Sequence, residues 1–385
     1  MNICIVAKYY YAERIGGAEV QAWLLACELA ARGHHVSYVC ESLSERGGTQ
    51  DRIEGVEIHW LKYRAYFNIL NLPSYARAVR RIQPTIVIHR YTSGYEWALG
   101  RYCMRQGAKF VWICTDNASP VRDRFVAMQR EMLRRYPRPT YKRVLLLLHA
   151  WIKDRSRERG MRYVTHPCVQ NSIQRRLFME NFGTPPFHFP SGHRIPKSVP
   201  TKQNPTIVLW VGAFSKIKRP ELFLDFVKYC ADLDVEFVMI SKPIPKNFHT
   251  PFKPFEDYAT NTPRFRWLID VPLDETLEWF DRAGVLVCTS ESEGFPNTFV
   301  QAWSRGVPVV SFGVNPNDIL ANPDLGRCVS SHEDARSATE AYLQEREKPG
   351  VRERRQDYAR QNFSIARVAD HLFDILERES PSLSD

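Results

Sequence analysis

The sequence lacks the features that mark exported and membrane-spanning proteins. Its nine cysteines are scattered from Cys4 to Cys328 without a Cys-x-x-Cys pair, and this odd, dispersed set is typical of a reducing cytosol rather than of a disulfide framework. Residues 2–7 have no basic start and run directly into a strand-like segment, so we expect no secretory signal. No apolar stretch approaches the roughly 18 residues that cross a bilayer. These absences predict a cytoplasmic protein that is soluble or peripherally bound to a membrane.

Length and composition predict a folded chain with more than one domain. The chain has 385 residues, which favours about two or three domains. Its apolar content of 44% is enough for large cores and argues against global disorder.

The net charge of +10 is concentrated in one segment. Residues 121–163 hold thirteen Arg and Lys against four acids, a net charge of +9, and enclose the apolar run 144–152 with its single Trp151. A basic helix with an apolar centre is typical of a segment that lies on an anionic membrane surface. The alternative is a buried helix with basic ends. Nucleic acid is not an expected partner, because no nucleic-acid module accompanies the charge.

The first half of the chain alternates strand-like and helical patterns. Strands are predicted at residues 2–7, 36–40, 56–61, 85–89 and 109–114, and helices at 18–32, 75–82 and 95–106. Gly33 is the expected helix stop after the first of these helices. Strands that alternate with helices indicate a parallel sheet.

The pattern stops at a proline-rich stretch and then resumes. A linker is predicted at 196–205, with the join between the two halves near 197–204. Beyond it, strands are predicted at 206–211, 235–241, 265–269, 284–288 and 308–312, and helices at 220–230, 273–282, 298–305, 333–344 and 365–377. The predicted fold class is therefore α/β, with two Rossmann-like halves.

A loop acid follows the apolar run 285–288. Glu293 stands in the loop, and Thr298 with Gln301 three residues on predicts a capping box, with Pro296 just outside it. The free amides of such a helix start attract phosphate. A carboxylate at Glu293 is suited to binding sugar hydroxyls.

This stretch resembles the nucleotide-sugar signature of the retaining GT-B glycosyltransferases, glycosyltransferase family 4. The family pattern is Glu-Gly-Phe, here Glu293 to Phe295, then a second acid eight positions after the first, then Gly-x-Pro-Val-Val, here 306–310. Gln301 replaces the second acid but can still hydrogen-bond a ribose hydroxyl. The resemblance implies two Rossmann-like domains facing each other across a cleft: an acceptor domain at 1–196, a donor domain at 204–364, and a last helix, about 365–385, that packs back on the first domain.

The resemblance extends to two loops that follow strands. Family members carry a Gly-Gly, often followed by Ala-Glu, that faces the diphosphate and the acceptor; here these are Gly16, Gly17 and Glu19. In the second domain the family strand ends in Gly-Arg, and a Lys about five residues later helps hold the donor phosphates. Gly212 and Lys218 match, whereas Ala213 replaces the Arg, and Lys216 and Arg219 are the candidates to compensate.

Two further positions are candidates on the acceptor side. Family enzymes often place a His after the strand at 109–114, and this chain has Asp116 there. Asp116 is suited to orienting an acceptor hydroxyl or taking its proton, but an Asx-type turn explains it equally well. Arg90, after the strand at 85–89, is a candidate to reach the same cleft.

The expected site therefore has three groups of residues. The expected catalytic residues are Glu293, Lys218 and Asp116. The expected donor-binding residues are Gly16, Gly17, Gly212, Lys218, Arg219, Glu293, Gly294, Phe295, Asn297, Thr298 and Gln301. The expected acceptor-binding residues are Glu19 and Arg90.

No cofactor and no metal is expected. His166, His188 and His193 have no metal-ligand spacing with a nearby carboxylate. Asp232 and Asp234 match the Asp-x-Asp of metal-dependent GT-A transferases, but they lie between a predicted helix and strand and are interpreted as a polar connector.

The predicted function is a retaining glycosyltransferase of the hexosyltransferase type. Its substrates would be a nucleoside diphosphate sugar and a lipid-linked or polysaccharide acceptor in cell-surface glycan synthesis, with residues 121–163 on the inner face of the cytoplasmic membrane. Because Ala213, Gln301 and Asp116 depart from the family pattern, a non-catalytic nucleotide-sugar-binding partner subunit is one alternative. A GT-B-fold nucleotide-sugar epimerase, which would turn over without an acceptor, is the other.

Overall fold

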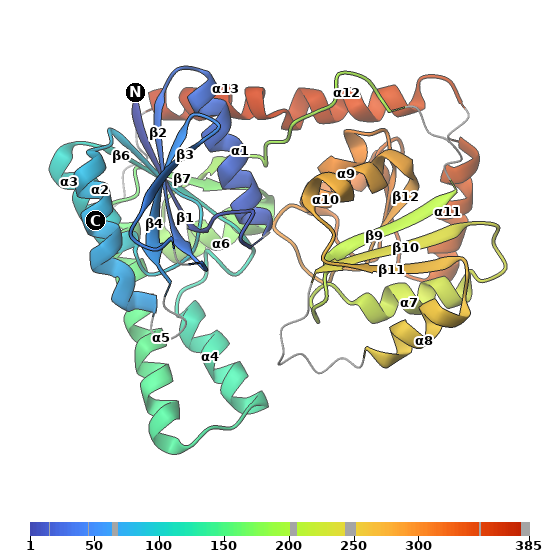
Figure 1. The fold of residues 1–385 in the computed structure, drawn as a ribbon, viewed down its shortest axis with the longest axis horizontal. Coiled ribbons are helices and arrows are strands. Elements are labelled where there is room, and N and C mark those ends of the chain that lie inside the picture. The colour runs from blue at the N-terminus through green and yellow to red at the C-terminus, as the bar shows by residue number, and fades with distance from the viewer. Residues whose placement is uncertain are drawn as a thin grey trace. The chain divides into compact units, whose positions relative to one another are not determined.

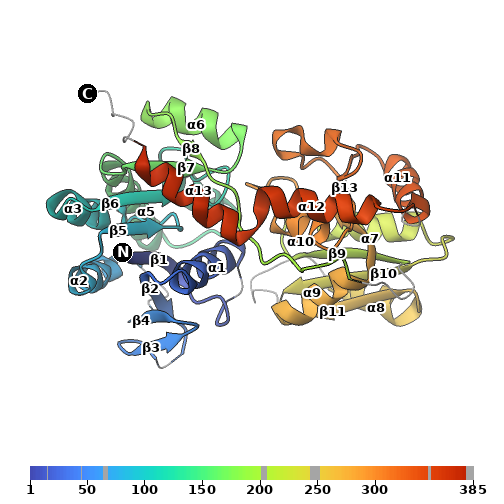
Figure 2. The same cartoon turned by 90° about the horizontal axis from the view of Figure 1, so that it is seen from above.

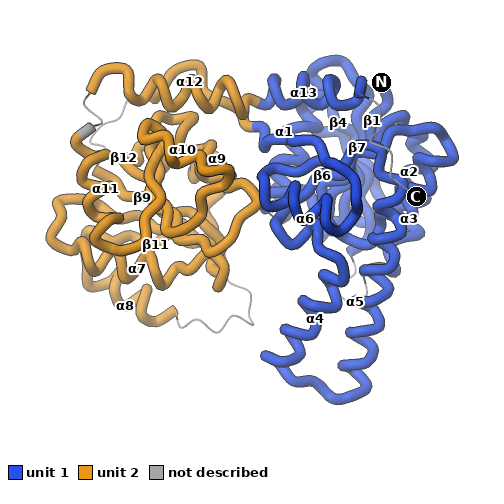
Figure 3. The backbone as a smooth tube through the Cα atoms, turned by 180° about the vertical axis from the view of Figure 1, so that it is seen from behind, with its two compact units in different colours: residues 1–192, 365–385 blue, residues 193–364 orange. Residues whose placement is uncertain are grey.

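The computed structural model describes residues 1–14, 16–44, 46–63, 68–200, 206–242, 252–345 and 348–378. It divides into two compact units, shown in Figure 3: unit 1 is residues 1–192 with 365–385, and unit 2 is residues 193–364. The sequence placed the domain limits at 196 and 204. Residue 204, the second half of the expected linker and the expected helix beyond residue 378 lie outside the described residues.

Unit 1 is built on a largely parallel sheet with the strand order β3-β4-β2-β1-β5-β6-β7-β8. The antiparallel pair is β3 with β4. Its strands are β1 (Asn2–Tyr9), β2 (His35–Ser42), β3 (Gln50–Ile53), β4 (Val56–Lys62), β5 (Ile86–His89), β6 (Lys109–Ile113), β7 (His166–Val169) and β8 (Phe187–His188). The central strands are apolar along most of their length, as expected for strands that are buried on both faces.

Helices cover both faces of this sheet. On one face, α1 (Gly17–Ala31) and α13 (Ile365–Glu377) share a core with alternate residues of β1 and lie side by side (Figure 2). On the other face, α2 (Leu72–Ile82), α3 (Glu96–Gln106) and α6 (Ser172–Phe182) share a second core. The Arg32 guanidinium of the α1 C-terminus pairs with Asp370 of α13 at 2.6 Å. The last helix of the chain therefore belongs to unit 1.

The basic segment forms two helices that project from unit 1 as a hairpin, α4 (Arg124–Arg135) and α5 (Thr140–Met161), visible in Figure 1. The apolar run lies around the middle of α5, and most of its large side chains are exposed, with Val144 at 59% and Trp151 at 51%. The buried-helix alternative is therefore wrong. Among the described residues, no helix combines the length and apolar character needed to span a bilayer.

Unit 2 repeats the α/β plan with a parallel sheet in the order β11-β10-β9-β12-β13-β14. Its strands are β9 (Ile207–Ala213), β10 (Glu236–Lys242), β11 (Phe265–Ile269), β12 (Ala283–Cys288), β13 (Val309–Ser311) and β14 (Gly326–Cys328). Alternate residues of β9 enter two cores. One core is shared with α7 (Pro220–Tyr229), α8 (Lys253–Asn261) and α11 (His332–Glu345). The other is shared with α9 (Leu273–Arg282), α10 (Asn297–Trp303) and α12 (Val351–Phe363). The α/β prediction is confirmed for both units.

Candidate functional site

The donor-side candidates lie where the strand order of unit 2 reverses. The chain leaves β9 toward β10 on one side and leaves β12 toward β13 on the other, and β9 and β12 are neighbours. Ligands of open α/β sheets bind beyond the carboxyl ends of strands at such a switch point. Lys218 follows β9 and Glu293 follows β12, so both loops meet at this place.

Lys218 and Glu293 form an ion pair between the Lys218 Nζ and the Glu293 Oε1. Their side chains are 26% and 17% exposed, so the pair is accessible to a ligand without being fully solvated. Burial raises the pKa of the Cys288 thiol at the end of β12, the charge of Glu293 adds to this increase, and Lys218 opposes it. The structure therefore brings together one cation and one carboxylate at the switch point.

Arg219 holds the loop that carries Lys218. It is a non-glycine residue with a left-handed φ of 48°, a conformation that carries backbone strain. Its guanidinium donates to the carbonyl oxygens of Thr289 and Phe312, at 2.6 Å each, and to that of Ser290 at 3.3 Å. These contacts join the ends of β12 and β13 to the loop, so the structure gives Arg219 a positioning role.

A second support of the Lys218 loop was missed by the sequence analysis. The indole Nε1 of Trp210 donates to the Thr289 hydroxyl at 2.9 Å, and this hydroxyl donates to the Lys218 carbonyl at 2.6 Å. The Glu291 amide also donates to the Ile217 carbonyl at 2.8 Å. The available signal was a buried Trp near a strand end, since a buried indole N–H needs a partner.

The predicted capping box is wrong. Helix α10 begins at Asn297, Pro296 takes the N-cap position, and no side chain caps the helix. Thr298 is therefore inside the first turn, two residues too late to cap it. Asn297, Thr298 and Gln301 are half-buried on this short helix.

Three other predicted donor-side residues have packing roles. Gly294 is buried, and Phe295 packs against Phe363 with ring centroids 5.0 Å apart. A Cβ at Gly212 would lie 2.9 Å from the Trp210 ring, so a side chain there would disturb the Trp210–Thr289 contact. The glycine is therefore required by close packing beneath the loop.

The Gly-Gly loop of unit 1 opens α1. Gly16 is the N-cap residue with extended backbone angles, and Gly17 is the first helical residue. A Cβ at Gly16 would clash with the Glu19 carboxylate, which folds back over the helix start. The structure therefore places Gly16, Gly17 and Glu19 together at the carboxyl end of β1.

Asp116 lies in the loop after β6 and makes an Asx turn. Its Oδ1 accepts hydrogen bonds from the Ala118 amide at 2.9 Å and from the Ser119 hydroxyl at 3.1 Å, and its Oδ2 pairs with Arg124 at 2.7 Å. Arg124 is the first residue of α4. The turn interpretation thus describes what the structure shows, and Asp116 connects the loop to the hairpin.

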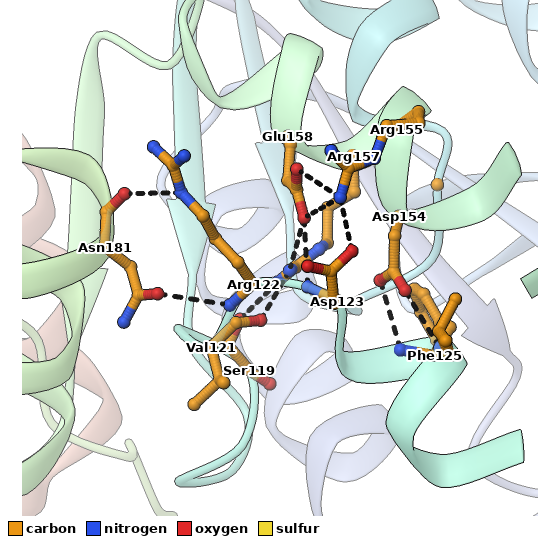
Figure 4. A network of polar contacts seen from close by, with 12 residues as sticks. Ser119, Val121, Arg122, Asp123, Phe125, Asp154, Arg155, Arg157, Glu158 and Asn181 are labelled. Carbon is orange, nitrogen blue, oxygen red and sulfur yellow. Dashed lines mark hydrogen bonds and ion pairs between the residues drawn. The ribbon is translucent and has the colours of Figure 1, made fainter. Parts of the chain in front are cut away.

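The base of the hairpin is a buried polar network (Figure 4). The carboxylate of Asp154, on α5, accepts hydrogen bonds from the Phe125 and Val126 amides at 3.1 and 2.9 Å and so caps α4. Buried Arg157 donates to the carbonyls of Ser119 and Val121 at 2.6 Å each. The hairpin and the Asp116 loop therefore form one connected element.

Arg90 is buried in unit 1. It is 4% exposed and donates to the Ser191 hydroxyl at 3.3 Å. Burial lowers the pKa of its guanidinium to about 10. Arg90 occupies an interior position, which does not suit the predicted contact with an acceptor.

The predicted site residues thus fall into two sets, one in each unit. Lys218, Arg219 and Glu293 come together in unit 2, and Gly16, Gly17 and Glu19 come together in unit 1. Among the residues that the structure describes, no group of three or more His, Cys, Asp or Glu side chains is arranged to hold a metal ion.

Two family models match the chain, and together they span more than half of it. The model described as "Glycosyltransferase Family 4" matches residues 15–153, and the model described as "Glycosyl transferases group 1" matches residues 205–344. The first match covers most of unit 1 up to the start of the polar network on α5, and the second covers both loops of the Lys218–Glu293 pair. A search of curated protein sequences gives no match.

Solved structures share the whole fold at low sequence identity. HepE of Anabaena, solved with UDP-glucose, has a TM-score of 0.69 and 12% identity, with 97% of this chain and 98% of that chain covered. Sucrose-phosphate synthase of Thermosynechococcus elongatus has a TM-score of 0.67 and 14% identity, with 97% and 98% covered. WaaG, a glycosyltransferase involved in lipopolysaccharide biosynthesis, has a TM-score of 0.64 and 15% identity, with 97% and 99% covered.

Proposed function

Because this chain belongs to the GT-B glycosyltransferases of the group 1, family 4 type, we propose that it transfers a sugar from a nucleoside diphosphate sugar to a lipid-linked or polysaccharide acceptor with retention of configuration. The observation that carries this proposal is the Lys218–Glu293 pair at the switch point of unit 2. HepE was solved with UDP-glucose, which makes a uridine diphosphate sugar the first donor to test.

Lys218 and Glu293 would contact different parts of a bound donor. Lys218 would turn its ammonium to the diphosphate and stabilise the charge that develops on the leaving nucleoside diphosphate. Glu293 would accept hydrogen bonds from sugar hydroxyls, and such bonds to a carboxylate are stronger than those between neutral groups. The fixed loop around Arg219 and Thr289 would keep both groups in place before the donor arrives.

We propose that the reaction needs no bound metal, since the Lys218 ammonium would supply the cation at the diphosphate. Chelation with EDTA should then leave the transfer rate unchanged. A rate that falls with EDTA and returns with a divalent cation would contradict this part of the proposal.

The donor assignment is tested by thermal shift with a panel of nucleoside diphosphates and their sugars. One nucleotide sugar should stabilise the wild type, because a ligand that binds the folded state raises its stability. Glu293→Gln should lose the sugar-specific part of the shift, and Lys218→Met should weaken nucleotide binding by about tenfold, or about 1.4 kcal/mol. The matched control is Glu291→Gln, two residues away on the same loop and exposed.

Two outcomes of this panel would contradict the proposal. The first is a wild type that no nucleotide sugar stabilises. The second is a Glu291→Gln variant that loses as much as Glu293→Gln. If a donor binds, the anomeric configuration of the product, read by NMR, tests the retaining mechanism.

We also propose that the α4–α5 hairpin holds the protein on the inner face of the cytoplasmic membrane, in cell-surface glycan synthesis. Exposed apolar side chains gather on its outer half, where one acid opposes six exposed cations. The apolar residues are Met128, Met132, Tyr141, Val144, Leu145, Leu148, Trp151 and Ile152. The cations are Arg130, Arg134, Arg135, Arg138, Lys142 and Arg143, and the acid is Glu131. Apolar insertion and basic charge act together on an anionic leaflet.

Sedimentation with phosphatidylglycerol vesicles tests the hairpin assignment. Reversing the charges of Arg134, Arg135 and Arg143 to Glu should abolish binding, since each basic residue near such a surface contributes about 1 kcal/mol. The matched control reverses Arg80, Arg81 and Arg105, which are also exposed and in unit 1 but outside the hairpin. Unchanged vesicle binding by the hairpin variant would contradict the assignment.

A further inference from the structure

Two lysines of unit 1 are partly or fully buried without a carboxylate at ion-pair distance within the described part of the chain. Lys8 is half-buried near the end of β1, and Lys153 on α5 is 8% exposed. The Lys8 ammonium lies 5.0 Å from the Tyr9 ring centroid and 5.3 Å from that of Tyr91. The Lys153 ammonium lies 3.7 Å from the Phe125 ring centroid. Buried charges in proteins are normally paired, so two such cations call for an anion.

Both lysines flank one loop at the switch point of the unit 1 sheet. The chain leaves β1 toward β2 and leaves β5 toward β6, on opposite sides, and β1 and β5 are neighbours. Tyr91, directly after β5, contacts Lys8, and Gly94 packs against Lys153. A Cβ at Gly94 would lie 3.3 Å from the Lys153 Cα and carbonyl oxygen. This is the position at which a parallel α/β sheet binds ligands.

Four carboxylates act on these lysines without forming ion pairs with them: Glu41 and Glu19 act on Lys8, and Glu96 and Asp154 act on Lys153. Glu96 accepts hydrogen bonds from the Ser93 and Gly94 amides at 3.1 and 2.6 Å. Glu41 accepts hydrogen bonds from the Asn71 amide at 2.9 Å and the Tyr95 hydroxyl at 3.1 Å, and burial raises its pKa. These contacts hold the two acids in place as local acceptors and keep them out of ion-pair reach of the lysines.

We propose that Lys8 and Lys153 form an anion site that binds a phosphoryl group of the acceptor substrate. The proposal rests on the proposed function, in which unit 1 takes the acceptor. A phosphate carries close to two negative charges at neutral pH and offers several acceptor oxygens, which suits two ammonium groups. The aromatic rings beside both lysines take the place of part of the surrounding water, so the attraction to phosphate is stronger than at a fully solvated surface.

The surroundings of Lys153 support this site in two ways. Burial and the nearby Lys8 charge lower the pKa of Lys153 to about 8, and burial lowers that of Lys8, so a bound anion would relieve an unfavourable pair of charges. Lys153 also directly follows Ile152, the last exposed apolar residue of α5. A phosphate whose lipid tail lies in the bilayer at this helix would meet Lys153 on the same turn.

The test uses the full chain in a Lys218→Met background, which removes the donor-side cation. Inorganic pyrophosphate should protect Lys8 and Lys153 from reductive methylation, read by mass spectrometry, whereas potassium chloride of equal ionic strength should not. Pyrophosphate affinity by calorimetry should fall about tenfold or more in Lys8→Met and in Lys153→Met, and Lys153→Arg should retain part of it. The control is Lys228→Met, an exposed lysine of α7 in unit 2.

Protection in the chain with both lysines present needs neither a Lys8 nor a Lys153 variant to fold, so it tests the site even where such a variant is unstable. Equal methylation with and without pyrophosphate would overturn the proposal, as would an affinity that folded lysine variants retain. Phosphatidylcholine vesicles containing phosphatidate, compared with soluble glycerol 3-phosphate, distinguish a lipid-borne from a soluble phosphate, and protection by either supports the site. Failure of the donor function would show separately, as a wild type that binds no nucleotide sugar.

Discussion

Residues on the donor side of unit 2 differ in what their loss should change. Lys218 and Glu293 carry the charges that a donor would meet, whereas Arg219, Thr289 and Trp210 bind parts of the chain around them. Replacing a charge should change ligand affinity with little effect on folding. Replacing a loop support should change both, because a buried donor or acceptor is left without a partner.

Thr289→Val is the sharpest test of a loop support. Valine keeps the shape of the fully buried Thr289 but removes the hydroxyl that joins the Trp210 indole to the Lys218 carbonyl. We expect unit 2 to lose about 1–3 kcal/mol in urea unfolding and donor affinity to fall with it. Thr260→Val is the control, because this exposed hydroxyl bonds the Glu256 carbonyl within one helix. Equal effects of the two changes would contradict the bridging role.

The lowered pKa of Lys153 predicts that the stability of unit 1 increases with pH. Its folded pKa of about 8 lies below the ordinary lysine pKa of 10.5, so the unfolded chain binds more protons between these values and stability rises with pH there. Lys8, Glu96, Arg124 and Asp154 are the charged groups that act on it. Relative to Lys153→Met, the wild type should gain about 2 kcal/mol in unfolding free energy between about pH 7 and about pH 9.5. A constant difference between the two proteins across this range would refute the assignment.

At the scale of elements, the hairpin depends on a few buried polar contacts at its base. The apolar cluster between its helices is small: Phe125, Val126 and Ala150. The Asp154 and Arg157 side chains add hydrogen bonds to main-chain groups at the start of α4 and in the loop before it (Figure 4). An element with so little apolar core is held mainly by such contacts, since buried polar groups left unpaired are costly.

Asp154→Ala should loosen α4 without unfolding the sheet of unit 1. The change leaves the Phe125 and Val126 amides unpaired, which should cost about 1–3 kcal/mol. Part of this cost is offset, because the burial that raises the pKa of the Asp154 carboxylate is itself unfavourable. Hydrogen exchange of the α4 amides should become faster, while exchange in β1 stays slow. Glu131→Ala, at an exposed i,i+3 and i,i+4 pair on α4, should leave exchange unchanged. Equal protection of α4 in both variants would count against the network.

The elements that the sequence predicted are those with strong apolar patterns. Most strands of both sheets were found within a few residues, as were the helices α1, α2, α3, α7, α9, α10, α11 and α13, because periodicity reports burial directly. The helices α6, α8 and α12 were not predicted. The missed strands are weak in that signal: β3 is polar and exposed, β7 contains Pro167, β8 has two residues and β14 has three. The hairpin was expected as one helix, although Pro137 and Pro139 in the break at residues 136–139 are local signals that end a helix.

The candidate site likewise could be predicted only where a local sequence pattern indicates it. Lys218 and Glu293 could be found from their spacing after apolar strands, because parallel strands bring such loops to one edge. The Thr298 capping box failed because the helix begins at Asn297, which places Pro296 and not Thr298 at the N-cap position. The Thr289 bridge and the Lys8–Lys153 arrangement join residues far apart in sequence, and no local pattern encodes such contacts.

At the scale of the whole molecule, each unit has its own hydrophobic core, but the core of unit 1 includes the last helix of the chain. Ile365, Val368, Leu372 and Ile375 of α13 are buried in the core shared with α1 and β1. The chain therefore passes through unit 2 before it can finish unit 1. Unit 1 is predicted to be the unit whose stability responds to changes in α13, although that helix follows unit 2 in sequence.

Leu372→Ala tests this division of the chain. Leu372 is fully buried, so its truncation should cost unit 1 about 2–5 kcal/mol through lost burial and the cavity left behind. Hydrogen exchange should become faster in α1 and β1 and stay unchanged in β9, and nucleotide binding at Lys218 should persist because that loop lies in unit 2. Arg367→Ala, exposed on the same helix, should change neither unit by more than about 0.5 kcal/mol. If Leu372→Ala instead accelerates exchange equally in β9, the two units unfold as one, and the donor and acceptor sides are energetically coupled through the chain rather than independent.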